Sequence, residues 1–137
     1  MRVVLDTNVL VSGLLQPRGP SGTIVRGVLR GKICLFYDAR ILNEYREVLR
    51  RPKFRFRPSE IEAFLDQLQS VGVPVAASAI SLQLPDPDDA PFLEVAVSGG
   101  APYLVTGNRR HFPGHIGPLK VVSPRDFLSL LDSEVET

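Results

Sequence analysis

Acidic or amide side chains occur at four places where the chain is expected to leave a strand or to present the inner face of a helix. The first is Asp6, which ends the apolar run Val3-Val4-Leu5. This run predicts a short buried strand, and ligands of open α/β sheets bind outside the carboxyl ends of the strands. A carboxylate at that point is placed for a metal ion or a substrate rather than for packing.

Glu44 is the second residue of this kind. It lies three residues after Ile41 and four before Val48, within a segment of helical periodicity, so it falls on or at the edge of the apolar face. A buried carboxylate without a partner is costly, and it needs a cation, a set of hydrogen bonds or a raised pKa. Two interpretations stay open: a metal ligand, or an ordinary carboxylate that is exposed at the helix edge or paired with Arg40 or Arg46.

Asp86, Asp88 and Asp89 place three acids within four residues. Asp89 precedes Phe92 by three positions and therefore shares its inward helical face. Helix capping and favourable first-turn charge explain one of Asp88 and Asp89. Capping and first-turn charge do not account for all three acids, which repel one another unless a cation binds there.

Asn108 follows the apolar run 103–105 as Asp6 follows the first strand. Thr, Gly and Asn are also common in plain turns, so this segment alone is a weak signal. His111 is a candidate catalytic base, but its position beside Phe112 favours a structural role.

Oxygen ligands without a cluster of His or Cys suit Mg²⁺ or Mn²⁺ rather than zinc. Such ions activate water and stabilise the charge that develops on a phosphodiester. Basic side chains must then hold the substrate, and two groups lie near the acids. The first group, 50–57, is interleaved with two phenylalanines, which fits a single-stranded nucleic acid. A solvated helix end and linker is an equally open interpretation of this segment. The candidate RNA contacts are Arg50, Arg51, Lys53, Arg55, Arg57, Arg109 and Arg110.

Short apolar strands alternate with helices along the chain, which predicts an α/β fold: a parallel β-sheet flanked by helices on both faces. Strands are expected at 3–5, 33–37, 103–105 and 120–122, with a further short one at 73–76. Helices are expected at 23–30, 39–50, 58–72 and 88–98, and a short one from 123 onward.

The 137 residues fit one domain, 1–137, with an ordinary hydrophobic content of 44%. The net charge of +1 gives no global argument for nucleic-acid binding. Cys34 is the only cysteine, so an intrachain disulfide is excluded and we expect this thiol in the core. No signal sequence or membrane-spanning stretch is expected, which favours a cytoplasmic protein without a membrane partner.

Four segments in this order resemble the PIN-domain nucleases, in the toxin-like group related to the VapC ribonuclease toxins. They are VVLDTNVL at 3–10, NEYREVL at 43–49, DPDDAPFLEVA at 86–96 and LVTGN at 104–108. The resemblance covers almost the whole chain. No single motif is specific, and the order and spacing together carry it.

The resemblance implies a doubly wound parallel sheet, metal-dependent RNA cleavage, a homodimer and a possible antitoxin partner that inserts near the active site. It makes Asp6, Glu44 and Asp89 the metal ligands and Asn108 the fourth catalytic position. The family often has Asp at that position. Asn removes one negative charge there, which weakens a second metal site.

The leading hypothesis is therefore a Mg²⁺- or Mn²⁺-dependent endoribonuclease, the toxin of a type II toxin–antitoxin pair. Three alternatives remain: an RNA-processing nuclease without an antitoxin, a catalytically weak RNA-binding module, and a phosphatase or nucleotidase. Asn108 favours the binding module, whereas the basic–aromatic stretch argues against a small substrate.

Overall fold

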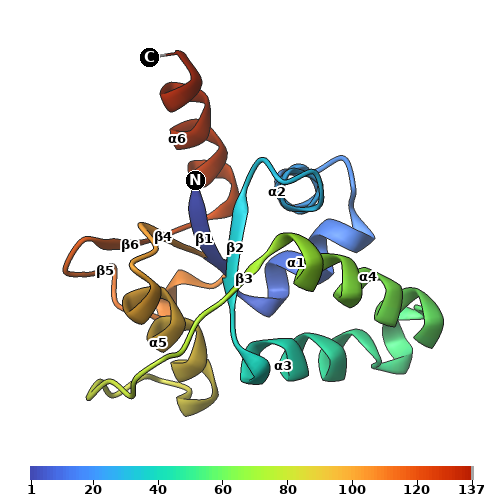
Figure 1. Cartoon of the computed structure of the whole chain (residues 1–137), viewed down its shortest axis with the longest axis horizontal. Coiled ribbons are helices and arrows are strands. Elements are labelled where there is room, and N and C mark those ends of the chain that lie inside the picture. The colour runs from blue at the N-terminus through green and yellow to red at the C-terminus, as the bar shows by residue number, and fades with distance from the viewer. Residues whose placement is uncertain (137) are drawn as a thin grey trace.

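A six-stranded sheet in the order β3-β2-β1-β4-β6-β5 forms the centre of the protein (Figure 1). The structure is a computed structural model that describes residues 1–136, with side chains to residue 133. The strands are β1 (Arg2–Leu5), β2 (Cys34–Tyr37), β3 (Val73–Pro74), β4 (Tyr103–Val105), β5 (His115–Ile116) and β6 (Leu119–Val122). All neighbouring pairs are parallel except β5 with β6.

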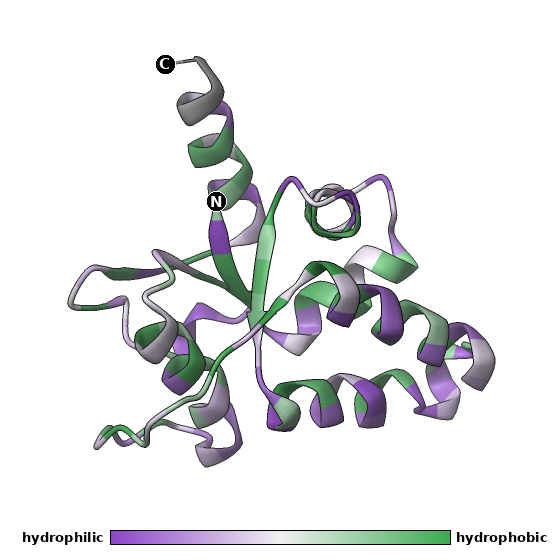
Figure 2. Cartoon of the chain, in the orientation of Figure 1, coloured by the Kyte–Doolittle hydropathy of each residue, from purple (hydrophilic) through white to green (hydrophobic). Residues whose placement is uncertain are grey.

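Six α-helices flank the sheet in the described part of the chain: α1 (Thr7–Leu15), α2 (Pro20–Leu29), α3 (Ala39–Leu49), α4 (Pro58–Val71), α5 (Ala90–Gly99) and α6 (Pro124–Glu136). Helix α5 packs across β1, β2 and β4, while α2 packs against α1, α4 and α6. Figure 2 shows apolar residues along the strands and along the inner sides of the helices, with polar residues outside. The predicted α/β class is confirmed.

The order of the strands reverses at β1. The chain passes from β1 to β2 and β3 on one side, then crosses to β4 and β6 on the other. In open α/β sheets such a reversal leaves a crevice outside the carboxyl ends of the two strands that flank it. Leu5 of β1 is in register with Val105 of β4. The segments that begin at Asp6 and Thr106 therefore leave the sheet side by side.

Most predicted elements are present, and the strand at 103–105 has the predicted bounds. Helix α1 was not predicted, because Val9 and Val11 extend an apolar run that is typical of a strand. Asp6 instead caps a helix through its side chain, which accepts a hydrogen bond from Thr7 N.

The helix predicted at 23–30 begins earlier, at Pro20, and other bounds or directions also differ from the prediction. Strand β5 was missed, and it makes the sheet edge antiparallel through a turn in which Gly117 has a φ of 54°. The helix predicted at 88–98 begins at Ala90, after a 3₁₀ turn over Pro87–Asp89. The last helix is longer than predicted and begins at Pro124.

Cys34 is a free thiol, half-buried and packed against the core, as expected. Over the described residues, no helix combines the length and the apolar character that crossing a membrane requires.

Tyr45 joins the helix of one candidate acid to the strand of another. Its side chain is fully buried in α3, and its hydroxyl donates a hydrogen bond of 2.5 Å to the carbonyl of Leu5, the residue before Asp6. The ring lies 6.4 Å from that of Phe92 in α5. This contact fixes how closely the face of α3 that carries Glu44 approaches the end of β1.

Tyr45→Phe should lower the free energy of unfolding by about 1–3 kcal/mol, because it leaves a buried carbonyl without this donor. Tyr103→Phe is the matched control: that ring packs edge-on against Phe127, and its hydroxyl has no partner among the described residues, so a change within about 0.5 kcal/mol is expected. Urea unfolding of both variants measures the difference. Equal losses would mean that the hydroxyl of Tyr45 contributes nothing specific.

Candidate active site

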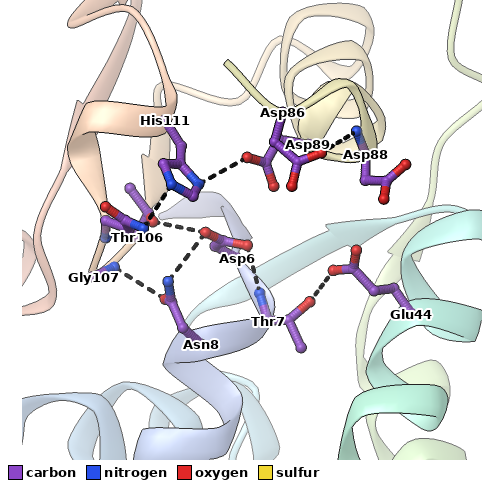
Figure 3. A network of polar contacts seen from close by, with 11 residues as sticks. Asp6, Thr7, Asn8, Glu44, Asp86, Asp88, Asp89, Thr106, Gly107 and His111 are labelled. Atoms are coloured by element: carbon purple, nitrogen blue, oxygen red, sulfur yellow. Dashed lines mark hydrogen bonds and ion pairs between the residues drawn. The ribbon is translucent and has the colours of Figure 1, made fainter. Parts of the chain in front are cut away.

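Asp6 lies at the centre of a polar network at the carboxyl end of β1 (Figure 3). It is 6% exposed. Its Oδ1 accepts a hydrogen bond from Thr7 N at 2.8 Å, and its Oδ2 accepts from Thr106 Oγ1 at 2.7 Å and from Asn8 Nδ2 at 3.3 Å. These donors come from α1 and from the segment after β4, so both strands at the reversal hold the same carboxylate.

Glu44 faces this carboxylate from α3. Asp38 caps that helix by accepting a hydrogen bond from Ile41 N at 3.0 Å, and Glu44 follows in the next turn. The side chain is half-buried, and one of its carboxylate oxygens accepts a hydrogen bond from the Thr7 hydroxyl. Thr7 thus links two of the candidate acids, through its amide to Asp6 and through its hydroxyl to Glu44.

An arginine partner for Glu44, one of the two interpretations left open by the sequence, is not present among the described side chains. Arg40 pairs with Glu94 at 2.6 Å, and Arg46 pairs with Glu62 at 3.0 Å. The half-buried carboxylate of Glu44 therefore lies beside other acids, without a compensating cation among the described side chains.

The three acids of the third segment take different roles. Asp86 caps the 3₁₀ turn, since its side chain accepts a hydrogen bond from Asp88 N at 3.0 Å. Asp88 is exposed, whereas Asp89 is only 9% exposed and turns toward the network. Asp88 and Asp89 lie in the first turn of this 3₁₀ helix, as expected, and Asp89 stands at the N-cap position of α5 without a capping hydrogen bond from its side chain.

The fourth segment joins the network through three contacts. Asn108 N donates to Thr106 Oγ1 at 3.0 Å, and Asn108 Nδ2 lies 3.0 Å from His111 Nε2. His111 Nδ1 lies 3.1 Å from Asp89 Oδ2. His111 is therefore a member of the site and not only a packing residue beside Phe112.

Burial is the main electrostatic feature of the three acids. Loss of solvent raises the pKa of Asp6, and hydrogen bonds from Thr106 and Thr7 N partly oppose the shift. Burial also raises the pKa of Glu44, with repulsion from Asp6 and Asp89 adding to it. Burial and then repulsion from Asp6 raise the pKa of Asp89 from 3.8 to about 6, against the lowering effect of His111. These carboxylates feel one another, as members of one site do.

The donor set fits a hard divalent cation that keeps part of its water shell. All of the network's acids offer oxygen, the ligand that Mg²⁺ and Mn²⁺ prefer. In the described part of the chain, no three or more His, Cys, Asp or Glu side chains are grouped so that they could hold a metal ion between them. Mg²⁺ is commonly held by only one or two carboxylates, with water as its other ligands. A bound cation would offset the electrostatic repulsion between the acids.

The candidate RNA contacts lie at the end of α3 and just after it, and in the turn that follows Asn108, and some pair with acids at the surface. Arg50, Arg57 and Arg109 lie 3.4–3.6 Å from Glu62, Glu60 and Asp126, respectively. No acidic partner is found within the described side chains for the other four, Arg51, Lys53, Arg55 and Arg110, all of which are exposed.

A groove of about 460 Å³ between α1 and α3 adjoins the acids on one side. Its walls include Thr7 and Glu44 at the site and Val11, Leu15 and Phe54 beyond it. We call this hollow the α1–α3 groove. Lys53 lies over the Phe54 ring at 5.1 Å, so the first basic group meets the groove at its far end.

Sequence reasoning named Asp6, Glu44, Asp89 and Asn108, and the structure brings all four to one network, directly or through one intervening side chain. It missed the two hydroxyl links, Thr7 and Thr106. Each lies within two residues of a strand end, and that position is the signal that could have identified them. It also undervalued His111, whose spacing of three from Asn108 places both on one side of a single turn.

Comparisons with known proteins bear on the family and the fold. A family model described as PIN domain matches residues 2–110. An uncharacterized protein of Methanocaldococcus jannaschii is 28% identical over 93% of this chain and 90% of its own length. A solved structure of VapBC2 from Rickettsia felis, bound to a DNA fragment from its promoter, matches with a TM-score of 0.57. That match covers 90% of this chain and 98% of the other at 14% identity, so it shows a shared fold.

Without divalent ions, the protein should lose stability as the pH rises from about 4 to about 6. The raised pKa of Asp89, about 6 against 3.8, makes the folded chain bind more protons than the unfolded chain in this interval. The free energy of unfolding then falls with pH and stays low above the folded pKa. Asp89→Asn cannot ionise, so it should flatten that fall and gain on the order of 1 kcal/mol at neutral pH, after allowance for solvent screening.

Urea unfolding in the presence of a chelator, across a pH series, measures the free energy of unfolding of wild type and of Asp89→Asn. Parallel curves for wild type and Asp89→Asn would contradict the prediction, because they would mean that Asp89 titrates alike in the folded and unfolded chains.

Proposed function

The chain belongs to the PIN domain family, a family of nucleases, and from this membership we propose that it is a metal-dependent endoribonuclease with residues 1–137 as one nuclease domain. The observation that carries the proposal is the set of two buried acids and one half-buried acid at the reversal of the sheet, with Glu44 lacking an arginine partner among the described residues. Such a set is costly to a metal-free protein. A divalent cation removes the cost and supplies the chemistry.

Asp6, Glu44 and Asp89 would hold Mg²⁺ or Mn²⁺, and Asn108 would be the fourth catalytic position, with its amide next to His111. A bound ion of this kind lowers the pKa of water and stabilises negative charge on a phosphodiester. The chain's own contribution is orientation. Thr106 and the amide of Thr7 restrain Asp6 from two sides, and the Thr7 hydroxyl restrains Glu44. Preorganised ligands need no rearrangement when substrate arrives.

RNA is the proposed substrate because the acids lie between basic side chains that are not engaged by acids in the described part of the chain. Arg51, Lys53 and Arg55 follow α3, and Arg110 lies in the turn after Asn108. A strand that crosses the acids can meet positive charge on both sides. Phe54 adds an aromatic ring beside the first basic group, a combination used by proteins that bind single strands.

The proposed protein partner is an antitoxin. The proposed oligomeric state is a homodimer, and the proposed location is the cytoplasm. The VapBC2 match supports the partner, since that toxin fold was solved with its partner and promoter DNA. The α1–α3 groove supports it independently, because it presents the apolar side chains of Val11 and Leu15 next to the acids, and Leu15 is 49% exposed. An apolar segment of a partner there would cover Glu44. An RNA-processing nuclease without an antitoxin is the second candidate, and a small antitoxin gene beside this one would decide against it.

Wild-type protein should cleave single-stranded RNA with Mg²⁺ or Mn²⁺ and stop when a chelator is added. Asp6→Asn should reduce the rate by about two orders of magnitude or more, because the site loses a charge that holds the ion. Asp66→Asn, which changes an exposed carboxylate on α4, is the matched control and should cleave at the wild-type rate. Gel assays measure cleavage, and growth after induced expression tests the toxin: only Asp6→Asn should abolish growth arrest.

Cleavage that persists in chelator, or that Asp6→Asn leaves intact, would remove the metal-dependent mechanism. Cleavage without growth arrest would favour the RNA-processing nuclease instead.

Arg51→Gln/Arg55→Gln should weaken RNA binding and reduce the log–log salt slope by about 1.4, since each phosphate contact to a single strand contributes about 0.7. The Asp6→Asn background prevents cleavage during the titrations. Arg30→Gln/Lys32→Gln is the matched control, because those exposed residues lie before the beginning of β2, at the amino ends of the strands and away from the carboxyl ends that carry the acids. An unchanged slope in the first variant would assign Arg51 and Arg55 to solvent or to a protein contact.

A further inference from the structure

His111 bridges two positions of the site that are 19 residues apart in sequence. The turn over Arg109–His111 is a single 3₁₀ turn that follows Asn108. Side chains three apart in such a turn lie above one another, so Asn108 and His111 project to the same side. Across from them, η2 (Pro87–Asp89) brings in Asp89. Figure 3 shows the imidazole between the two segments.

The contacts of the imidazole fix its hydrogen-bonding roles. The amide nitrogen of Asn108 donates, so His111 Nε2 accepts at 3.0 Å. His111 Nδ1 then carries the hydrogen and donates to Asp89 Oδ2 at 3.1 Å. Both ring nitrogens are therefore engaged, and neither is available as a metal ligand or as a base in this arrangement.

The bridge divides the site into two parts. On one side lie Asp6, Glu44 and the Oδ1 atom of Asp89, to which no described group donates. On the other side, the space between Asp89 Oδ2 and residue 108 is spanned by the imidazole. A second ion at that place would have to displace the ring, and it would then meet a neutral amide rather than a carboxylate.

We propose that His111 takes the position of a second cation, so that this site binds a single divalent ion among Asp6, Glu44 and Asp89. This inference rests on the proposed function. His111 is then a positioning residue: it restrains Asp89 through Oδ2 and leaves Oδ1 for the ion. Replacing a hydrogen-bond partner of a metal-binding carboxylate typically weakens metal affinity 10–100-fold.

The bridge predicts that charge at position 108 is not sufficient to create a second site. In Asn108→Asp, the new carboxylate would accept a hydrogen bond from His111 Nε2, and the imidazole would remain between two acids. Only the double variant Asn108→Asp/His111→Ala both adds a carboxylate and clears the space. The two changes are thus coupled, and neither alone should raise the number of ions bound.

Titration of Mn²⁺ followed by calorimetry and electron paramagnetic resonance tests the proposal on the intact, RNA-free chain. Wild type and Asn108→Asp should bind one Mn²⁺ with the signal of an isolated ion. His111→Ala should also bind one, about tenfold or more weaker. The double variant should bind two, with the signal of a spin-coupled pair. His115→Ala, which changes the exposed histidine of β5, is the matched control and should match wild type.

Two Mn²⁺ ions in wild type, or one in the double variant, would overturn the role of His111 while leaving the proposed nuclease intact. No Mn²⁺ bound by wild type would overturn the proposed function as well. Circular dichroism and the coincidence of urea transitions establish that each variant is folded. A second double variant, Asn108→Asp/His111→Ser, repeats the test with a polar side chain should the alanine form fail to fold.

Discussion

The burial of Asp6 is the constraint on which the rest of the site depends. Its carboxylate lies where β1 ends and α1 begins, almost out of contact with water. An ionised group in that position requires donors around it, and the chain supplies them from the helix N-terminus and from Thr106. The helix terminus also contributes partial positive charge. The reversal of strand order makes this possible, because only there do two strand ends open toward the same crevice.

The same burial explains why the site is electrostatically unfavourable without a ligand. The hydrogen bonds stabilise Asp6, yet its pKa stays raised, and so do those of Glu44 and Asp89. Elsewhere the protein pairs its buried or half-buried acids: Glu94 accepts from Arg40 and from Ile80 N, and Glu62 accepts from Arg46. The chain therefore satisfies carboxylates by ordinary ion pairs where no function is at stake. At the site it uses hydroxyls and amides, which orient an acid without neutralising it.

How far the sequence predicts this arrangement depends on the range of the interaction. Strand ends and helical faces are local properties, and they predicted Asp6, Glu44, Asp89 and Asn108 together with the fold class. Helix α1 was missed because its valines favour a strand locally, and the cap from Asp6 overrides that preference. A place beside a strand end marks Thr106 as a candidate, but neither its link to Asp6 nor the links made by His111 could be predicted from local properties. Both join segments that meet only after the sheet has formed, and the hydroxyl of Thr106 acts on an acid 100 positions away.

The role of position 108 shows why a family pattern has to be weighed with its neighbours. Taken alone, Asn in place of Asp suggests a site that has lost charge and hence activity. In the structure, the amide of Asn108 faces His111, and the imidazole faces Asp89. An amide donates to the ring, whereas a carboxylate would accept from it, so the identity of residue 108 decides which hydrogen the imidazole carries. Asn108 and the histidine three residues later therefore belong to one feature of the site. The imidazole of His111 fills the space between positions 89 and 108, which two facing carboxylates would leave open to an ion.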